Sequence, residues 1–420
     1  MKNNNQQDLV ISGVGVTASV GQGKDAFIAA LLRGEHQFAK MQRPGRQLPQ
    51  PEQGENPTPG REFLGAEIGE LTLSGRLPAS LLRTCSFSAR VGAVTLDEAW
   101  QDAALEQYPG QRIGLIVGGS NFQQRELVLA QDKYRGKTQF LRPTYAMSYM
   151  DSDLCGMATE IFGIKGSAYS LGGASASGQL AVIKAAEAVQ SGQVDVCIAV
   201  GALMDLSYWE CQAFRSLGAM GSDDFADKPA LAARPFDRDR NGFIYGESCG
   251  VVVVEKAETA AKRGLTPYAR LAGWGLAMDG NRNPNPSFDG EVKVIEQALA
   301  MAGQEAQGID YVNPHGTGSM IGDETELKAL AHCGLAHARI NTTKSVIGHG
   351  LSAAGAVEVI ATLLQMKEGR LHPSRNLENP MDASFNWVYQ QAVEHQIRTA
   401  LNLSMGFGGI NTAVCLSKAD

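Results

Sequence analysis

The chain has 420 residues, of which 44% are hydrophobic and 19% are charged. A chain of this length and composition folds around a large core, which excludes an intrinsically disordered protein. Its formal net charge of −7 argues against a general role in nucleic-acid binding.

The N-terminal residues and the cysteines indicate the cellular compartment. The first seven residues are polar and lack the apolar segment of a signal peptide, and the apolar runs further along are of strand length. The seven cysteines are scattered without a Cys-x-x-Cys pair, which predicts reduced thiols and neither disulfides nor a zinc site. We therefore expect a cytoplasmic protein that does not associate with a membrane.

Strand and helix patterns alternate along the first half of the chain. Strands are predicted over residues 9–14, 112–118, 167–170, 194–201 and 249–256, and helices over residues 25–32, 79–104, 149–162 and 176–190. Residues 41–60, which are rich in Pro, Gly, Gln and Arg, are predicted to form an exposed surface insertion. Residues 214–242 are predicted to be mostly loop.

The second half repeats this alternation, which makes the predicted fold class α/β. Strands are predicted over residues 268–278 and 309–312, and helices over residues 291–301 and 352–366. Helices 176–190 and 352–366 are alike: each begins with small residues, continues with apolar ones and is followed by a glycine, Gly192 or Gly369. The likeness indicates a duplicated architecture, with chance resemblance between two alanine-rich helices as the alternative.

The segment from Tyr169 to Gly178 is predicted to be a sharp corner between a strand and a helix. Gly172 and Gly173 lack the Cβ atoms that would block access to this corner. The first turn of the following helix directs free backbone N–H groups at the same place. Ser175 is therefore either part of a nucleophile or oxyanion site or an ordinary helix N-cap.

Two histidines lie next to glycines, at the end of a predicted strand or in a loop before a helix. They are His315, in the segment His-Gly-Thr-Gly-Ser, and His349, in the segment Lys-Ser-Val-Ile-Gly-His-Gly. Either a catalytic or a structural role fits this context. The other five histidines are predicted to lie at the surface, and none of the spacings suits a zinc site: His36, His332, His337, His372 and His395.

These motifs together resemble the β-ketoacyl synthase branch of the thiolase superfamily. Members of that branch have a cysteine nucleophile in an Ala-Cys-Ser-like corner and a Pro-Phe-Asp…Arg-Asp-Gly-Phe…Gly-Glu-Gly block. A His-Gly-Thr motif, a Lys-Ser…Gly-His motif and a Gly-Phe-Gly-Gly hairpin follow. The chain has a counterpart of all five blocks, in this order, between Leu171 and Thr412. The predicted first strand also matches the start of the family.

The resemblance assigns roles to residues of the predicted site. His315 and His349 match the catalytic pair, and Lys344 matches the residue that supports the network around them. Asp323 and Glu326 match the acidic pair that follows the first histidine; a structural cation, a salt bridge and helix capping are all open for Glu326.

Further residues match the walls of the family's pocket. Thr317 and Ser319 match hydroxyls that contact the phosphopantetheine arm. Phe407, Gly408 and Phe243 match the oxyanion and gating wall, with ordinary core packing as the alternative for the two phenylalanines.

The resemblance also implies an overall architecture and partners. It predicts a thiolase-like fold in five layers, α-β-α-β-α, with one half formed by residues 1–258 and the other by residues 259–420. It implies a homodimer that acts on an acyl group carried by the phosphopantetheine of an acyl carrier protein (ACP), with no cofactor, metal, nucleic acid or membrane of its own.

The chain departs from the family at Ser175, which stands where the nucleophilic cysteine is expected. Two smaller departures are Arg240-Asn-Gly-Phe in place of Arg-Asp-Gly-Phe and Gly246-Glu-Ser in place of Gly-Glu-Gly. Both are expected to affect local structure only. A thiol ionises near pH ~8.5, whereas a serine hydroxyl is a far weaker acid and its ester is a poor acyl donor. Condensation is therefore impaired, whereas decarboxylation, which needs no covalent attachment, keeps both histidines as hydrogen-bond donors.

This combination resembles the free-standing decarboxylating ketosynthase-like proteins of trans-acyltransferase polyketide pathways. It predicts decarboxylation of malonyl-ACP to acetyl-ACP for β-branching in polyketide antibiotic biosynthesis. The alternatives are a condensing synthase that uses Ser175 as its nucleophile, a Cys-to-Ser trapped variant of such a synthase, and a non-catalytic partner of the chain-length-factor kind. The presence of both His315 and His349 argues against the last of these.

Overall fold

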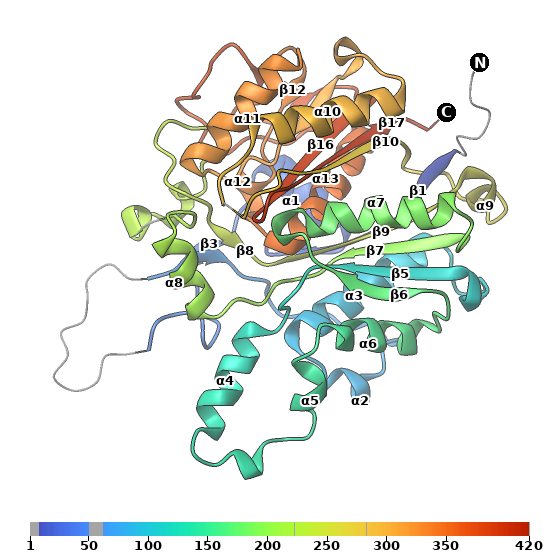
Figure 1. Ribbon diagram of the computed structural model, residues 1–420, viewed down its shortest axis with the longest axis vertical. Coiled ribbons are helices and arrows are strands. Elements are labelled where there is room, and N and C mark those ends of the chain that lie inside the picture. The colour runs from blue at the N-terminus through green and yellow to red at the C-terminus, as the bar shows by residue number, and fades with distance from the viewer. Residues whose placement is uncertain (1–7, 50–61, 222, 283, 420) are drawn as a thin grey trace.

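The computed structural model describes residues 8–49, 62–221, 223–282 and 284–419. Helices and sheet segments alternate in five layers (Figure 1), in the order helices, strands, helices, strands, helices. The predicted α/β fold in five layers is confirmed.

The strands between the lower and middle helix layers of Figure 1 come from the N-terminal part of the chain. In spatial order they are β6 (Ala168–Leu171), β5 (Ile113–Gly118), β7 (Val196–Gly201), β9 (Ser248–Lys256) and β1 (Leu9–Ala18). β6, β5 and β7 run parallel, and β9 is antiparallel to both β7 and β1. Because helices cover both faces, β5 and β7 are continuous apolar runs in which every residue is buried.

The strands of the C-terminal part have the same order and directions. They are β12 (Arg339–Ile340), β11 (Tyr311–Asn313), β16 (Thr399–Gly406), β17 (Ile410–Ser417) and β10 (Ala269–Met278), with β14 (Asn386–Trp387) beside β12. β12, β11 and β16 run parallel, and β17 is antiparallel to β16 and β10. A short antiparallel pairing of β1 with β10 joins the two sets. The repeated order supports duplication over chance resemblance.

The middle layer consists of α7 (Ser177–Gln190) and α13 (Ala354–Glu368), which pack against each other. Each follows a short 3-10 turn whose first residue has a positive φ: 46° at Ala174 and 50° at Leu351. The helices meet at two glycines. A Cβ atom on Gly178 would lie 2.8 Å from the Ala356 nitrogen, and one on Gly355 would lie 2.7 Å from Gln179 Cβ. The small residues at both helix starts therefore allow this close approach.

The outer layers bury the remaining sheet faces. α3 (Phe87–Asp102) and α6 (Ser152–Phe162) cover the N-terminal strands, and α10 (Phe288–Ala302) and α11 (Met320–His332) lie over the C-terminal ones. The smaller elements are β2 (Gly21–Gln22), α1 (Lys24–Arg33), β3 (Phe38–Lys40), β4 (Leu64–Ala66), α2 (Ala79–Leu82), α4 (Gln124–Tyr134), α5 (Tyr145–Ser148), α8 (Tyr208–Ser216), β8 (Tyr245–Gly246), α9 (Ala257–Ala261), α12 (Lys344–Ile347), β13 (Arg370–Leu371) and β15 (Val393–Glu394). All seven cysteines are free thiols. Within the described ranges, no helix is long and apolar enough to cross a bilayer.

The prediction of an exposed insertion over residues 41–60 is only partly correct for its described part, residues 41–49, of which Gln42, Pro44 and Pro49 are exposed. Met41 and the Arg46 side chain are buried. Arg46 is held inside the protein because its guanidinium pairs with Asp205 at 2.8 Å and with Glu247 at 2.5 Å. Residues 50–61 lie outside the described part of the chain.

Two further predictions need correction. The helix predicted over residues 79–104 is divided into α2 and α3, because Ser86 caps a new helix by accepting a hydrogen bond from the Ala89 N–H. His372 is fully buried and not at the surface. Its ring nitrogens lie 3.1 Å from Thr343 Oγ1 and 2.9 Å from the Pro373 carbonyl oxygen, which satisfies both of them.

Candidate active site

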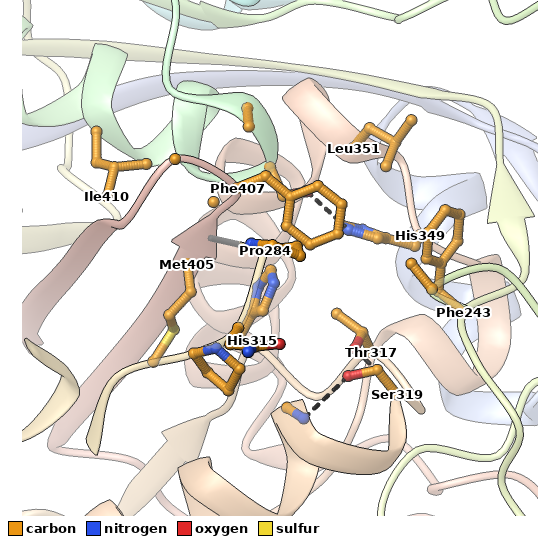
Figure 2. Close-up of a pocket in the computed structure, with 18 of the residues that line it drawn as sticks. Phe243, Pro284, His315, Thr317, Ser319, His349, Leu351, Met405, Phe407 and Ile410 are labelled. Atoms are coloured by element: carbon orange, nitrogen blue, oxygen red, sulfur yellow. Dashed lines mark hydrogen bonds between the residues drawn. The ribbon is translucent and has the colours of Figure 1, made fainter. Parts of the chain in front are cut away.

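A cavity of ≈ 680 Å³ opens where the predicted motifs meet. Its walls are formed by the corner before α7, the loop that follows β11, the loop before α13 and the hairpin between β16 and β17. Every residue of the predicted site except Lys344 lines this cavity. Figure 2 shows the rings of His315 and His349 turned toward the central space, with Phe407 on one side and Thr317 and Ser319 on the other.

Ser175 lies in the turn between β6 and α7. The positive φ of Ala174, 46°, bends the chain so that the next residue faces the cavity. Ser177, not Ser175, holds the turn: its hydroxyl accepts from the Gly173 N–H at 2.8 Å and donates to the Ala174 carbonyl at 2.7 Å. Since a neighbour takes the structural role, the Ser175 hydroxyl is available to the cavity.

His349 is the hydrogen-bond partner of Ser175. Its Nε2 lies 3.0 Å from Ser175 Oγ, and the residue is buried. The backbone of His349 is fixed on both sides, because its N–H donates to the Ile244 carbonyl and its carbonyl accepts from the Gly246 N–H. The Phe243 ring stands edge-on to the imidazole, with 5.2 Å between ring centroids. The imidazole orientation is therefore set by packing as well as by hydrogen bonds.

His315 lies beside His349, with 5.5 Å between the ring centroids and the ring planes nearly perpendicular. Glu326 anchors its loop: one carboxylate oxygen accepts from the His315 N–H at 2.5 Å and the other from the Gly316 N–H at 2.8 Å. From behind the cavity, Lys344 donates to the His315 carbonyl oxygen. Three separate segments thus converge to hold this one histidine.

Both imidazoles are neutral at physiological pH. Burial lowers the pKa of His315 and of His349 well below the ordinary value, and the positive charge of Lys344 lowers both pKa values further. A neutral imidazole carries a single N–H, so each ring can offer one donor to a developing negative charge. Lys344 itself forms a buried ion pair with Glu358.

The acidic residues Asp323 and Glu326 shape the loop that carries His315. Asp323 accepts from the Thr317 and Gly318 N–H groups through one oxygen and from the Phe236 N–H through the other. Burial raises the pKa of Asp323 to about 6 and that of Glu326 to about 8. Over the described ranges, no group of three or more His, Cys, Asp or Glu residues is arranged to hold a metal ion.

Thr317 and Ser319 form the lower wall of the cavity in Figure 2. Ser319 is the N-cap of α11, and its Oγ accepts from the Gly322 N–H at 3.1 Å. Thr317 Oγ1 accepts from the Ser319 N–H at 3.2 Å. Both oxygens accept backbone hydrogen bonds, and both hydroxyl hydrogens remain available to a ligand.

Aromatic side chains form the opposite wall. Phe407, in the hairpin between β16 and β17, is 43% exposed, and Gly408 follows it with φ 91°. Phe214 links the two predicted phenylalanines, because its ring lies 5.6 Å from Phe243 and 6.3 Å from Phe407. Phe407 thus stands at the solvent-facing side of a small aromatic group next to His349.

Several cavity residues lie outside every predicted motif, among them Phe214 and Glu291. Phe214 is in α8, within a segment predicted to be mostly loop. Glu291 is in the first turn of α10 and is only 1% exposed. The sequence held no signal for this role, because an acidic residue in the first turn of a helix is ordinarily explained by the helix dipole.

Comparisons with known proteins agree with this geometry. The family model "Beta-ketoacyl synthase, N-terminal domain" matches residues 6–260, and "Beta-ketoacyl synthase, C-terminal domain" matches residues 268–378. The chain is 57% identical to a Bacillus subtilis protein named "Polyketide biosynthesis malonyl-ACP decarboxylase PksF", over 99% of this chain and 98% of that protein.

More distant relatives agree as well. The chain is 30% identical to 3-oxoacyl-[acyl-carrier-protein] synthase 1 of Escherichia coli, over 97% of this chain and 98% of that one. A crystal structure of a β-ketoacyl synthase from Burkholderia phymatum is similar, with TM-score 0.86 and 27% identity, over 99% of this chain and 100% of that chain.

Proposed function

Because the chain belongs to the β-ketoacyl synthase family, we propose that it uses this fold to decarboxylate malonyl-ACP to acetyl-ACP. One observation carries the proposal: both imidazoles face the cavity while Ser175, not a cysteine, occupies the corner beside His349. The groups that stabilise an enolate are present, and the thiol that would capture an acyl chain is absent. The identity of 57% to the decarboxylase PksF supports the same conclusion.

The reaction follows from the placement of the two histidines. The carbonyl oxygen of the malonyl thioester lies between His315 and His349 and accepts an N–H from each. The bond from the carboxylate carbon to Cα breaks, carbon dioxide leaves, and the electron pair moves onto the thioester oxygen as an enolate. Two preorganised donors stabilise this charge, and losing one typically costs roughly 10²–10³ in rate.

Ser175 acts as a positioning residue. Its hydroxyl holds His349 through the contact of 3.0 Å, and an acyl chain captured there would form an oxygen ester, which is a poor acyl donor to a carbanion. The same contact is also the geometry of an activated serine, and this favours one competing function, a condensing synthase with Ser175 as its nucleophile. An acyl adduct on Ser175 would identify that alternative.

The substrate reaches the site on the arm of an acyl carrier protein. Thr317 and Ser319 offer hydroxyl donors to the amide oxygens of phosphopantetheine, and Phe407 with Phe243 closes the aromatic side of the channel. The cavity volume of ≈ 680 Å³ leaves room for part of this arm as well as for the malonyl group.

A second copy of the chain is also part of the proposal. β6 is the last strand of the N-terminal set, no described strand pairs with its outer edge, and Tyr169 on it is 43% exposed. Pairing of β6 with its counterpart in a second copy would cover this edge. The homodimer would supply acetyl-ACP for β-branching in polyketide biosynthesis.

Mass spectrometry of the carrier protein tests the function directly. Incubation with malonyl-ACP should convert it to acetyl-ACP with no acyl adduct on the enzyme. Malonyl-ACP that persists unchanged in the presence of correctly folded enzyme would refute the proposal, and an adduct on Ser175 would support the condensing alternative.

A further inference from the structure

One wall of the cavity carries an acid that the decarboxylation step does not use. Glu291 lies in the first turn of α10, whose N-cap Ser287 accepts a hydrogen bond from the Gly290 N–H at 3.1 Å. The Glu291 side chain lines the cavity and is 1% exposed. Its Oε2 has no hydrogen-bond partner among the described residues. A buried carboxyl oxygen without a partner is rare, and it requires an explanation.

Other carboxyl groups surround Glu291. Glu326, Asp279 and Asp323 all act on it electrostatically, and they come from α11 and from the end of β10. Burial is the main cause that raises the pKa of Glu291 well above its ordinary value, and repulsion from the ionised forms of these three acids raises that pKa further. Burial and these neighbouring acids therefore favour the protonated, neutral form of the Glu291 carboxyl group.

The neighbouring acids are already engaged by other groups. Both oxygens of Glu326 accept backbone hydrogen bonds from the His315 loop, and both oxygens of Asp323 accept others. Asp279 accepts from Asn411 Nδ2 at 2.7 Å and is partly exposed. Glu291 thus lines the cavity and combines burial, a carboxyl group that favours its protonated form and an oxygen without a hydrogen-bond partner among the described residues.

Decarboxylation creates a need for such a proton. In a condensing synthase the carbanion attacks an acyl group held on cysteine, but in this chain Ser175 carries no acyl group. The enolate can only become an acetyl thioester if its Cα receives a proton. The two histidine N–H groups are directed at the thioester oxygen, and hydroxyl groups such as that of Thr317 are much weaker acids.

We propose that Glu291 is the general acid that protonates Cα of the enolate, an inference that rests on the proposed decarboxylase function. The Glu291 O–H bond breaks and a C–H bond forms at Cα. The electron pair on the thioester oxygen restores the carbonyl double bond. Glu291 is left as a carboxylate beside Glu326 and takes up a proton from water, so each turnover consumes one proton and releases one carbon dioxide.

The isotope carried by the product tests this assignment. The reaction is run on malonyl-ACP in an equal mixture of H₂O and D₂O, and the new hydrogen of the acetyl group is analysed by mass spectrometry. In the wild-type enzyme a single enclosed proton is delivered whichever isotope it is, so hydrogen and deuterium should appear in nearly equal amounts. In Glu291→Gln, water must protonate the enolate, and hydrogen should be favoured severalfold.

Two variants serve as controls for this experiment. Asp289→Asn changes an exposed acid on the same helical turn and should give the wild-type isotope ratio. Glu291→Asp keeps an acid at the position and should restore a ratio closer to that of the wild type than Glu291→Gln does.

The possible outcomes separate this inference from the proposed function. A wild-type product that already favours hydrogen severalfold would overturn the role of Glu291, whatever the variants do. An identical ratio in wild type and Glu291→Gln would overturn it as well. Absence of acetyl-ACP from the wild-type reaction would instead refute the proposed function itself.

Discussion

His349 Nε2 and Ser175 Oγ lie 3.0 Å apart although 174 positions separate them in the chain. The contact joins the corner before α7 to the loop before α13, so the two similar units of the fold meet at the proposed site of reaction. In the proposed mechanism the hydroxyl only positions the imidazole, so its removal should matter little for decarboxylation.

Ser175→Ala should therefore keep most of the decarboxylase activity. The loss of one hydrogen bond, about 1 kcal/mol, corresponds to a decrease of less than about tenfold in the rate of acetyl-ACP formation. Ser175→Cys should in addition form an acyl-enzyme, visible in the intact mass of the protein. Complete loss of decarboxylation in Ser175→Ala would show that the hydroxyl takes part in the chemistry.

Replacing either histidine should lower the decarboxylase activity far more than replacing Ser175 does. His315→Ala and His349→Ala should each lower the rate of acetyl-ACP formation by roughly 10²–10³, because each removes one donor to the enolate oxygen. His332→Ala, at an exposed position of α11, is the matched control and should retain full activity. Equal and small effects at all three positions would contradict the mechanism.

Much of this architecture could be predicted from the sequence because buried strands are continuous apolar runs. The runs over residues 194–201, 249–256 and 268–278 lie within two residues of β7, β9 and β10. The two-residue strands β12 and β14 were not predicted, because two residues cannot show a period. Such short strands are determined only by their pairing with neighbouring strands, here β12 with β11 and β14 with β12.

The residues of the site also differ in whether the sequence could predict them. Ser175, His315 and His349 could be predicted because their glycine-rich motifs determine local backbone geometry. Phe214 and Glu291 could not, because they reach the cavity through the packing of α8 and α10 and carry no local motif. Arg46 was wrongly placed at the surface because its partners Asp205 and Glu247 are distant in sequence.

Because His372 is buried, the free energy of unfolding should decrease as the pH falls below 6.5. Burial lowers its pKa from 6.5 to about 4 in the folded protein, so the unfolded chain binds the proton more readily between these values. The contribution of a neutral His372 is complete above pH 6.5 and is lost as the pH falls toward 4, which amounts to roughly 3 kcal/mol.

The difference between wild type and His372→Gln isolates this effect from that of the buried carboxyl groups. Denaturant unfolding at several pH values should show the stability advantage of the wild type changing by this amount between pH 6.5 and 4. A difference that is independent of pH would contradict the prediction.

Lys344 should be important for stability because its ion pair with Glu358 is buried. Lys344→Met leaves Glu358 without its partner and the His315 carbonyl without a donor, and should cost about 3–5 kcal/mol in the free energy of unfolding. Lys344→Met combined with Glu358→Gln should be less destabilised than the single variant, since no charge remains unpaired.

An exposed ion pair provides the control for Lys344. Lys328 pairs with Glu324 on α11, where both side chains are more than half exposed, so Lys328→Met should cost less than about 1 kcal/mol. Similar losses for Lys328→Met and Lys344→Met would show that burial of the Lys344 pair does not matter.

Gly178 tests whether the close packing of α7 and α13 requires small residues. A Cβ atom there would lie 2.8 Å from the Ala356 nitrogen and 2.9 Å from the Ser352 carbonyl oxygen, and neither backbone atom can move aside easily. Gly178→Ala should therefore destabilise the protein by about 1–3 kcal/mol. It should also reduce activity, because the crossing lies next to Ser175.

Gly156 in α6 is the matched control, since a Cβ atom there would meet nothing within 4 Å. Gly156→Ala should raise the free energy of unfolding by up to about 1 kcal/mol, because alanine loses less conformational freedom in a helix than glycine does. Thermal and denaturant unfolding of both variants measure the two effects. Since the same substitution is made in a helix each time, opposite signs would show that the contact between α7 and α13, and not helix propensity, requires glycine at position 178.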